Sequence, residues 1–317
     1  MICRFSVLIV RVSAIFVLCK IISFKDMSQI PESELILNKD GSVYHLNLLP
    51  EDLAPVVINV GDPDRVAMVS SYFDQIDVKK QKREFITHTG FYKGKRISVI
   101  STGIGTDNID IVYNELDALV NIDLPSRTIK KELTSLHLVR IGTSGSLQSD
   151  IPVDNFVCST FGLGLDGLLN FYKLINTDEE DQIIKAFRLH YPSHGVLSLP
   201  YLTKAGSKLV DLLSPGMFKG ITASCSGFYA PQMRQLRLEP SRMDMIDKLH
   251  TFNFGEHRIT NFEMETGAMY GLARLMGHHC CAVNVIVANR ITQEYSKDAE
   301  SAMHRLIKTV LDRLATL

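Results

Sequence analysis

An arginine inside an apolar run gives the first indication of chemistry in this sequence. Residues 136–146 read Leu-His-Leu-Val-Arg-Ile-Gly-Thr-Ser-Gly-Ser, which predicts a buried strand that opens into a tight glycine-containing loop. A permanently charged guanidinium such as that of Arg140 is rarely buried unless an anionic group meets it. The predicted loop supplies backbone N–H groups and two hydroxyls, which suit an oxyanion. Two interpretations stay open: an anion site, or an arginine paired with a carboxylate.

Two further segments carry polar groups next to predicted strands. Residues 56–60 predict a buried strand, and a Gly-Asp-Pro-Asp-Arg turn and a helix follow it, as in many phosphate sites, although this is also ordinary turn chemistry. Residues 226–234 form a loop with two aromatic residues, and Gln232 and Arg234 stand two residues apart in it. Such a pair can present a hydrogen-bonding edge to a planar polar ligand. An exposed loop without function is the alternative.

Two glutamates complete the set of candidate groups. Residues 261–267 read Asn-Phe-Glu-Met-Glu-Thr-Gly and predict an extended segment that feeds a helix ending near residue 275. Alternation along the extended segment places Glu263 and Glu265 on one side. Two neighbouring carboxylates at a strand-to-helix junction are unusual in a purely structural core.

The elements that must position these groups alternate along the chain. Further strands are predicted at residues 83–92, 96–100, 154–160, 218–225 and 279–287. Helices are predicted from residue 66 onward and at residues 109–120, 182–187, 203–213 and 301–314. This order predicts a single-domain α/β fold of three layers, α/β/α, with a central sheet that is mixed because of the hairpin near residue 92.

Composition and charge exclude several classes of function. The chain has 317 residues, 45% of them hydrophobic, and its 34 basic and 35 acidic residues give a net charge of -1, so neither nucleic acid nor a membrane is an expected partner. Six cysteines without CxxC spacing indicate reduced thiols in a cytoplasmic protein. No metal site is expected at residues 278–281, although they read His-His-Cys-Cys, because neighbours on a strand face opposite sides.

The amino-terminal residues differ from the rest of the chain. Residues 1–26 contain apolar runs interrupted by Arg11 and Lys20, and no A-x-A cleavage site precedes Met27. We expect translation to start at Met27, or residues 1–26 to form a disordered extension, in preference to a targeting segment. Residues 1–41 are therefore assigned to an extension and arm, and residues 42–317 to the domain.

Residues 42–316 resemble the nucleoside phosphorylase family, and within it the uridine phosphorylases. The motifs that carry the resemblance are Gly61-Asp62-Pro63-Asp64-Arg65, Arg83-Glu84-Phe85, Ser101-Thr102-Gly103-Ile104-Gly105, Arg140-Ile141-Gly142-Thr143-Ser144-Gly145, Phe228-Tyr229 with Gln232 and Arg234, Phe262-Glu263-Met264-Glu265, and Asn289-Arg290. The glutamine and arginine pair is typical of the uridine phosphorylases and not of their purine-specific relatives.

The resemblance implies a role for each matched residue. The residues implied to bind phosphate are Gly61, Arg65, Arg83, Arg140 and Thr143. The residues implied to bind ribose are His45, Glu263, Met264 and Glu265. The residues implied to bind uracil are Phe228, Gln232, Arg234, Ile286, Val287 and Arg290. Because Arg83 and His45 are implied to reach the site of a neighbouring subunit, a homo-oligomer, either a dimer or a hexamer, is expected.

The implied reaction is the reversible phosphorolysis of uridine to uracil and ribose 1-phosphate, with phosphate as co-substrate and with no metal or organic cofactor. The implied catalytic residues are Arg140, Gln232, Arg234 and Glu265. Two alternatives remain: a purine or broad-specificity nucleoside phosphorylase, and a non-catalytic paralogue that binds nucleosides.

Three positions depart from the family pattern. Pro231 stands where a glycine is common, and its fixed φ could change how Gln232 is aimed. Asn108 stands where bacterial members carry a serine near a monovalent cation. Ala288 is an extra residue before Asn289, so the alignment of the two residues preceding it is open by one position.

Overall fold

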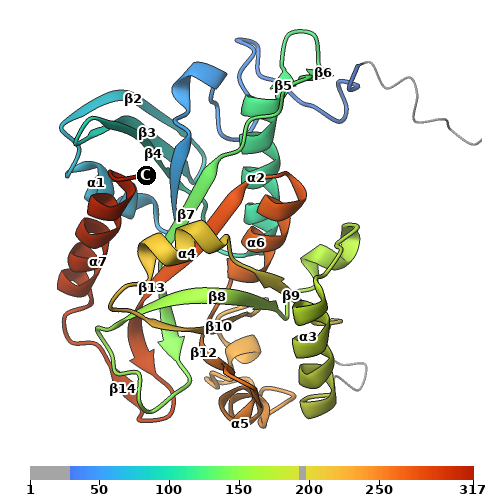
Figure 1. Ribbon diagram of the computed structural model, residues 1–317, viewed down its shortest axis with the longest axis vertical. Helices are drawn as coiled ribbons and strands as arrows, with labels where there is room; N and C mark the ends of the chain where they lie inside the picture. Colours follow the sequence, from blue (N-terminus) through green and yellow to red (C-terminus); the bar gives the residue numbers. More distant parts are fainter. Residues whose placement is uncertain (1–28, 193–197) are drawn as a thin grey trace, which may run out of the picture.

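A twelve-stranded mixed sheet covered by helices forms the body of the protein in the computed structural model, which describes residues 29–192 and 198–317 (Figure 1). The expected start or extension at residues 1–26 lies outside the described residues. The mixed α/β fold predicted from the sequence is confirmed. Within the described residues, no helix is long and apolar enough to cross a membrane.

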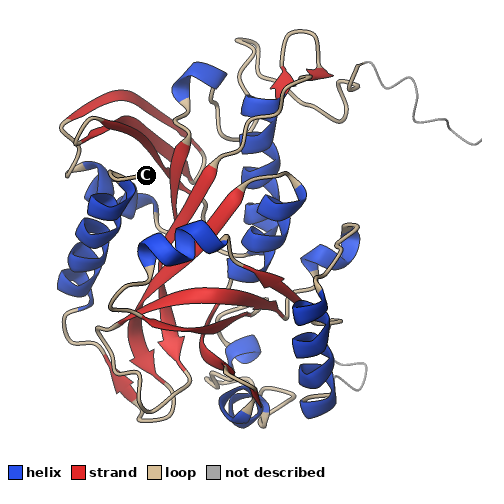
Figure 2. Ribbon diagram, in the orientation of Figure 1, coloured by secondary structure: helices blue, strands red, loops and turns tan. Residues whose placement is uncertain are grey.

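The strands and helices follow one another in an alternating order (Figure 2). The strands of the main sheet are β1 (Val56–Val60), β2 (Gln75–Lys82), β3 (Phe85–Tyr92), β4 (Lys95–Ser101), β7 (His137–Ser146), β8 (Phe156–Gly164), β9 (Tyr201–Lys204), β10 (Phe218–Ser224), β11 (Asn253–Phe254), β12 (His257–Glu263), β13 (His279–Asn289) and β14 (Glu294–Tyr295). A separate small hairpin pairs β5 (Ile122–Asp123) with β6 (Thr128–Ile129). The helices are α1 (Pro63–Ser70), α2 (Thr106–Asn121), α3 (Asp178–His190), α4 (Ser207–Leu213), α5 (Met245–Thr251), α6 (Thr266–Leu275) and α7 (Ala299–Leu314).

Parallel strands form the centre of the sheet. β1 pairs in parallel with β4 and with β7, and β7 pairs in parallel with β13. The predicted hairpin is present, because β3 pairs antiparallel with β4. The carboxyl ends of the four parallel strands therefore meet at one edge, which is where ligands bind in open α/β sheets.

A second connection closes part of the sheet into a ring. β12 pairs antiparallel with the end of β7, through Asn261 with Ser146 and Phe262 with Gly145. The path from β7 through β13, β8, β10 and β12 thus returns to β7. The loop predicted at residues 142–145 is wrong: these residues belong to β7, because both β13 and β12 hydrogen-bond to them.

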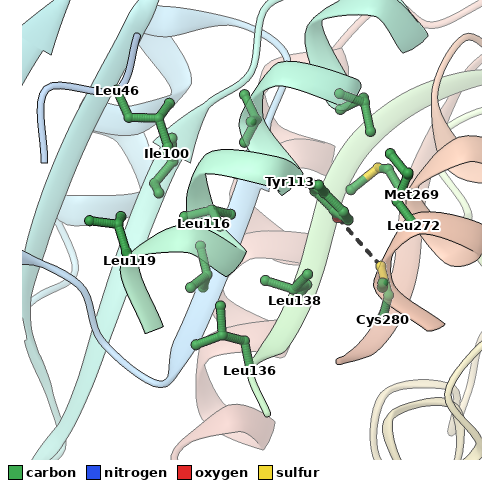
Figure 3. Packing of buried hydrophobic residues seen from close by; sticks show 14 of the residues in the cluster. Leu46, Ile100, Tyr113, Leu116, Leu119, Leu136, Leu138, Met269, Leu272 and Cys280 are labelled. Atoms are coloured by element: carbon green, nitrogen blue, oxygen red, sulfur yellow. Dashed lines mark hydrogen bonds between the residues drawn. The ribbon is translucent and has the colours of Figure 1, made fainter. Parts of the chain in front are cut away.

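Apolar side chains fill the space on both faces of the sheet. Residues of α1, α4 and α7 pack on one face, and residues of α2 and α6 pack on the other. Figure 3 shows this second layer, in which the hydroxyl of Tyr113 lies 3.5 Å from the sulfur of Cys280. Helices α3 and α5 cover the strands of the ring. These layers hold the ends of the central strands in fixed positions.

Local signals explain most differences from the predicted elements. Helix α3 begins earlier than predicted, because Thr177 and Glu180 form a reciprocal capping box at its start. The helix predicted at residues 203–213 is the short strand β9 followed by α4. The prediction missed β2, whose alternating exposed and half-buried residues are mostly polar, as is common on an edge strand.

Candidate active site

A cavity of about 710 Å³ opens at the carboxyl ends of the central strands and is lined by many of the residues singled out in the sequence. These are Gly61, Arg65, Arg140, Thr143, Phe228, Gln232, Arg234, Glu263, Met264, Glu265 and Val287. Strands β7, β12 and β13, the segments after β1, β10 and β12, and helix α1 contribute them, so segments far apart in the sequence meet here.

Arg140 and the two glutamates form a buried cluster at this cavity. Nη2 of Arg140 donates to Glu265, and Nε of Arg140 lies 3.4 Å from Oε2 of Glu263. The guanidinium of Arg140 is therefore paired with carboxylates, as the second of the two interpretations of the sequence required. Burial lowers the pKa of Arg140, but Glu265 and Glu263 outweigh it, and the net shift is upward. Arg140 is thus held as a cation inside the cavity wall.

Hydrogen bonds fix both carboxylates. Glu263 accepts from the hydroxyl of Ser224 at 2.7 Å and from the backbone N–H groups of Glu265 and Thr266 at 3.0 Å. Glu265 accepts from the N–H of Gly105 at 2.8 Å. Burial raises the pKa of Glu263, whereas Arg140 overcomes burial at Glu265 and keeps the pKa of that carboxyl below its usual range. The two carboxyls therefore differ in their readiness to hold a proton.

Arg65 adds a second guanidinium near the first. Its pKa is lowered by burial and then by the charge of Arg140, with Asp62 acting in the opposite direction. Among the described residues, no carboxylate forms an ion pair with Arg65. Two cations that repel each other, one of them without an ion-pair partner, favour an anion between them. Thr143, which is half-buried on β7, lines the same cavity.

A second group of lining residues comes from the loop after β10. Nη1 of Arg234 donates to Oε1 of Gln232 at 2.5 Å and to the carbonyl of Phe228 at 2.7 Å. The guanidinium carbon of Arg234 lies 3.8 Å from the centre of the Phe228 ring. Pro231 sits inside the single turn Ala230–Gln232 that turns Gln232 inward, where its side chain is buried. The loop thus presents an amide and a guanidinium together.

A model of the phosphorylase superfamily matches residues 55–315. The chain belongs to the phosphorylase superfamily. It is 32% identical over 265 residues to a uridine phosphorylase of Thermococcus kodakarensis, with 83% of each chain covered. It is also 25% identical over 278 residues to a DeoD-type purine nucleoside phosphorylase of Streptococcus suis, with 86% of this chain and 98% of the relative covered.

Two solved structures share the fold of this chain. A Trypanosoma brucei nucleoside phosphorylase, described as showing uridine phosphorylase activity, superposes with a TM-score of 0.82 at 27% identity, covering 89% of this chain and all (100%) of that one. A uridine phosphorylase of the oomycete Phytophthora capsici shares the fold, with a TM-score of 0.64 at 19% identity over 91% of this chain and 99% of that one.

Four residues singled out in this nucleoside phosphorylase do not line the cavity. The side chain of His45 lies 2.6 Å from Glu115 beside a different hollow, and Arg83 is exposed with a left-handed φ of 53°. Arg290 lies behind the loop after β10 and donates to the carbonyls of Gln232 and Met233. Ile286 is fully buried in an apolar cluster beside the ring strands, away from the lining.

Several residues that line the cavity were not assigned individual roles from the sequence. They are Asp62, Pro63, Glu84, Gly103, Ile104, Asn108, Ser144, Gly145, Phe262, Ala288 and Tyr295. Most stand inside the quoted motifs, so the motifs carried a signal for them, but Tyr295 lies in a polar stretch that gave none. Within residues 29–192 and 198–317, no group of three or more His, Cys, Asp or Glu side chains is arranged to hold a metal ion.

Proposed function

We propose that this nucleoside phosphorylase is a uridine phosphorylase, which converts uridine and phosphate reversibly into uracil and ribose 1-phosphate. The observation that carries the proposal is the hydrogen-bonded pair of Gln232 and Arg234 in the wall of the cavity that also contains Arg140. The identity to the Thermococcus kodakarensis enzyme supports it.

Phosphate would bind between the guanidinium of Arg140, which is buried, and that of Arg65, which is half-buried. Arg140 and Arg65 supply charge-assisted hydrogen bonds, which are roughly twice as strong as neutral ones. Thr143 supplies a hydroxyl, and Gly61 brings the backbone of the β1–α1 turn to the cavity. These contacts would hold one phosphate oxygen in line with the anomeric carbon of the sugar, so that the reaction becomes effectively unimolecular.

Ribose would bind against the glutamates. Glu265, which lines the cavity, would accept hydrogen bonds from the sugar hydroxyls, and Met264, which is half-buried in the lining, would pack on the sugar. Glu263 would support Glu265 through the backbone hydrogen bonds described above. Because positive charge builds on the sugar in an oxocarbenium-like transition state, the phosphate below it and the carboxylate beside it would stabilise that charge.

Uracil would be recognised and released at the loop after β10. The carbon–nitrogen bond breaks as the phosphate oxygen attacks, and its electron pair leaves with uracil. Gln232 and Arg234 would donate to the base and stabilise this negative charge, with a contribution on the order of 3 to 4 kcal/mol per well-placed donor. Phe228 and Val287 would line the base, and Arg290 would hold the loop. No general acid and no cofactor is required.

A second copy of the chain would complete the site. Arg83 would reach the phosphate and His45 the ribose 5′-hydroxyl of the neighbouring subunit, since neither lines the cavity of its own chain. We therefore include a homo-oligomer, either a dimer or a hexamer, in the proposal.

The second candidate function is that of a purine nucleoside phosphorylase. The DeoD-type relative, which is 25% identical to this chain over nearly its whole length, supports it. The carboxamide and guanidinium of the loop favour uracil. A non-catalytic nucleoside-binding protein is less well supported, since Pro231 does not turn Gln232 away from the cavity.

One assay separates the three functions. Uridine and inosine are each followed by absorbance with and without inorganic phosphate. Phosphate-dependent turnover of uridine, at least about a hundredfold faster than that of inosine, is expected, since a polar pocket rejects a ligand that leaves its groups unpaired. Preferential turnover of inosine would select the purine function. A folded protein that turns over neither nucleoside would select the binding protein.

A further inference from the structure

One end of the Arg140 guanidinium has no partner on the protein. Nη2 donates to Glu265 and Nε lies near Glu263, whereas Nη1 is buried and, among residues 29–192 and 198–317, has no hydrogen-bond acceptor. A buried charged donor of this kind destabilises the folded protein unless an acceptor meets it. Because the guanidinium is planar and rigid, an acceptor at Nη1 would also fix the direction of the other nitrogens.

Asn284 offers an unused acceptor on the same face of the sheet. It is fully buried on β13, where it pairs in register with Gly142 of the parallel strand β7. Residues paired across parallel strands point to one face, and so do residues two apart on one strand, so the side chains of Asn284 and Arg140 share a face. Within the described part of the chain, neither the oxygen nor the nitrogen of the Asn284 amide has a hydrogen-bond partner.

These two unpaired groups meet at Gly142. A β-carbon there would stand 1.8 Å from Nη1 of Arg140 and 2.5 Å from Oδ1 of Asn284, so both atoms border the same point. The terminal torsion of an asparagine side chain is broad, so a small rotation can direct Oδ1 at Nη1. A guanidinium only donates hydrogen bonds, so the amide must present its oxygen to it.

A second asparagine, Asn59, is less suited to hold Nη1. It is also buried, and it stands on β1 in register with Arg140. Its oxygen already accepts from the hydroxyl of Tyr113 at 3.2 Å, and its unpaired atom is the nitrogen Nδ2, a donor. Two donors cannot hydrogen-bond to each other. Asn284 is therefore the asparagine whose unpaired oxygen matches the unpaired nitrogen of Arg140.

We propose that Asn284 is a positioning residue for phosphate binding: its carboxamide oxygen holds Nη1 of Arg140 behind the cavity wall, so that Nη2 faces the phosphate. Asn284 lies outside the cavity lining and would touch no substrate. The guanidinium is then fixed at both ends, by Glu265 and Glu263 on one side and by Asn284 on the other. The inference rests on the proposed function, in which Arg140 binds phosphate.

Binding of inorganic phosphate, measured by titration calorimetry without nucleoside, tests the proposal, and initial rates at varied phosphate and varied uridine accompany it. Asn284→Leu keeps nearly the same side-chain volume and removes the acceptor. We expect Kd and KM for phosphate to rise about tenfold, because a guanidinium that is free to turn loses part of its bidentate contact. KM for uridine should rise less than about twofold.

Asn284→Asp keeps the shape of the side chain and its oxygen, and adds a negative charge beside Nη1. A third carboxylate would cancel charge that attracts the phosphate dianion, so Kd for phosphate is expected to rise about thirtyfold or more. If Asn284 only filled space in the core, this isosteric change would leave the affinity for phosphate unchanged. The variant also keeps the proposal testable if Asn284→Leu does not fold.

Asn121→Leu is the matched control. Asn121 is a buried asparagine at the end of α2, its amide bonds to Asp117 and to the N–H of Thr134, and it lies outside the cavity lining. This variant is expected to melt at a lower temperature and to keep the wild-type Kd for phosphate.

Two results would overturn the role of Asn284. One is a wild-type Kd for phosphate in both Asn284 variants, and the other is an equal rise of KM for phosphate and for uridine. A wild-type protein that binds phosphate but does not cleave uridine would instead overturn the proposed function, while the Kd values of the variants would still decide the role of Asn284.

Discussion

The β-carbon that Gly142 lacks would stand 1.8 Å from Nη1 of Arg140, so the guanidinium of Arg140 occupies the place of a side chain at residue 142. The two residues are separated by one position on β7, where side chains point to the same face. The same β-carbon would lie 2.5 Å from Oδ1 of Asn284 on β13. The long side chain of Arg140 can therefore fold back toward the glutamates only because residue 142 is a glycine.

Gly142→Ala is predicted to displace Arg140. The guanidinium must shift, because both of the nearest atoms are closer than real β-carbon contacts allow. We expect kcat/KM for phosphate to fall about a hundredfold, as for a catalytic group misplaced by about 1 Å, and the free energy of unfolding to fall by about 1–3 kcal/mol from overpacking. Steady-state kinetics and thermal melting measure the two effects. Gly145→Ala is the stability control, since its β-carbon makes ordinary contacts. Wild-type kinetics in Gly142→Ala would contradict the geometry.

Arg140→Lys separates a phosphate ligand from a purely structural arginine. Lysine keeps the charge and loses the planar fork that can join Glu265 and a phosphate at once. We expect KM for phosphate to rise about tenfold or more, with a smaller change in KM for uridine. Initial rates against each substrate and the melting temperature are measured together. A variant that melts early yet keeps wild-type phosphate dependence would show that Arg140 serves only the buried ion pairs.

Arg234→Ala is predicted to act on the base instead. Loss of the guanidinium removes the partner of Gln232 and the donor proposed for uracil, so kcat/KM for uridine should fall about a hundredfold to a thousandfold. KM for phosphate should change less than about threefold, because its proposed ligands are elsewhere. Arg242→Ala, which removes an arginine paired with Asp244 outside the cavity lining, is the control. A larger effect on phosphate than on uridine would contradict the assignment.

The raised pKa of Glu263 predicts that the free energy of unfolding decreases as the pH rises. Burial raises its pKa from 4.5 to about 7 in the folded protein, against the attraction of Arg140. The folded state therefore holds this proton more tightly than the unfolded chain, and the stabilisation is complete below about pH 4.5 and lost as the pH rises through about 7.

Glu263→Gln should remove this dependence while keeping an oxygen that accepts from the N–H groups of Glu265 and Thr266. Melting temperatures between about pH 5 and about pH 8 are expected to fall less steeply in the variant than in the wild-type protein. Asp150→Asn is the control. Arg258 lowers the pKa of Asp150, so this carboxyl does not titrate in this range, and its removal should leave the slope unchanged. An unchanged slope in Glu263→Gln would show that another group titrates.

The sequence predicted those parts of the fold that depend on local pattern. The apolar strands β1 and β13 and the terminal helix α7 follow from periodicity alone. Residues 142–145 look like a loop because glycines and small hydroxyl residues dominate them. They are a strand because β13 pairs with all four of them and β12, more than a hundred residues later, pairs with Gly145 and Ser146. That long-range pairing has no local signature.

The site likewise combines features that follow from local sequence with features that depend on long-range contacts. The burial of Arg140 with an anionic partner was predictable, since an arginine in an apolar run needs one, but the choice of Glu265 and Glu263 depends on the closed ring of strands. The extra residue Ala288 was visible in the sequence, whereas the shift in register that it makes was not, because that shift is seen only in the pairing of β13 with β7. The roles proposed for His45 and Arg83 would need a second copy of the chain, which the sequence pattern of one chain does not reveal.

The most direct test of the central claim is to identify the sugar product formed from uridine. The wild-type protein is incubated with uridine and inorganic phosphate, the products are followed by phosphorus NMR and by chromatography of the base, and the rate is measured as the phosphate concentration is varied. The account predicts equal amounts of uracil and ribose 1-phosphate, no base release without phosphate, and accumulation of uridine when the two products are supplied instead. Release of uracil with free ribose at a rate independent of phosphate would contradict it.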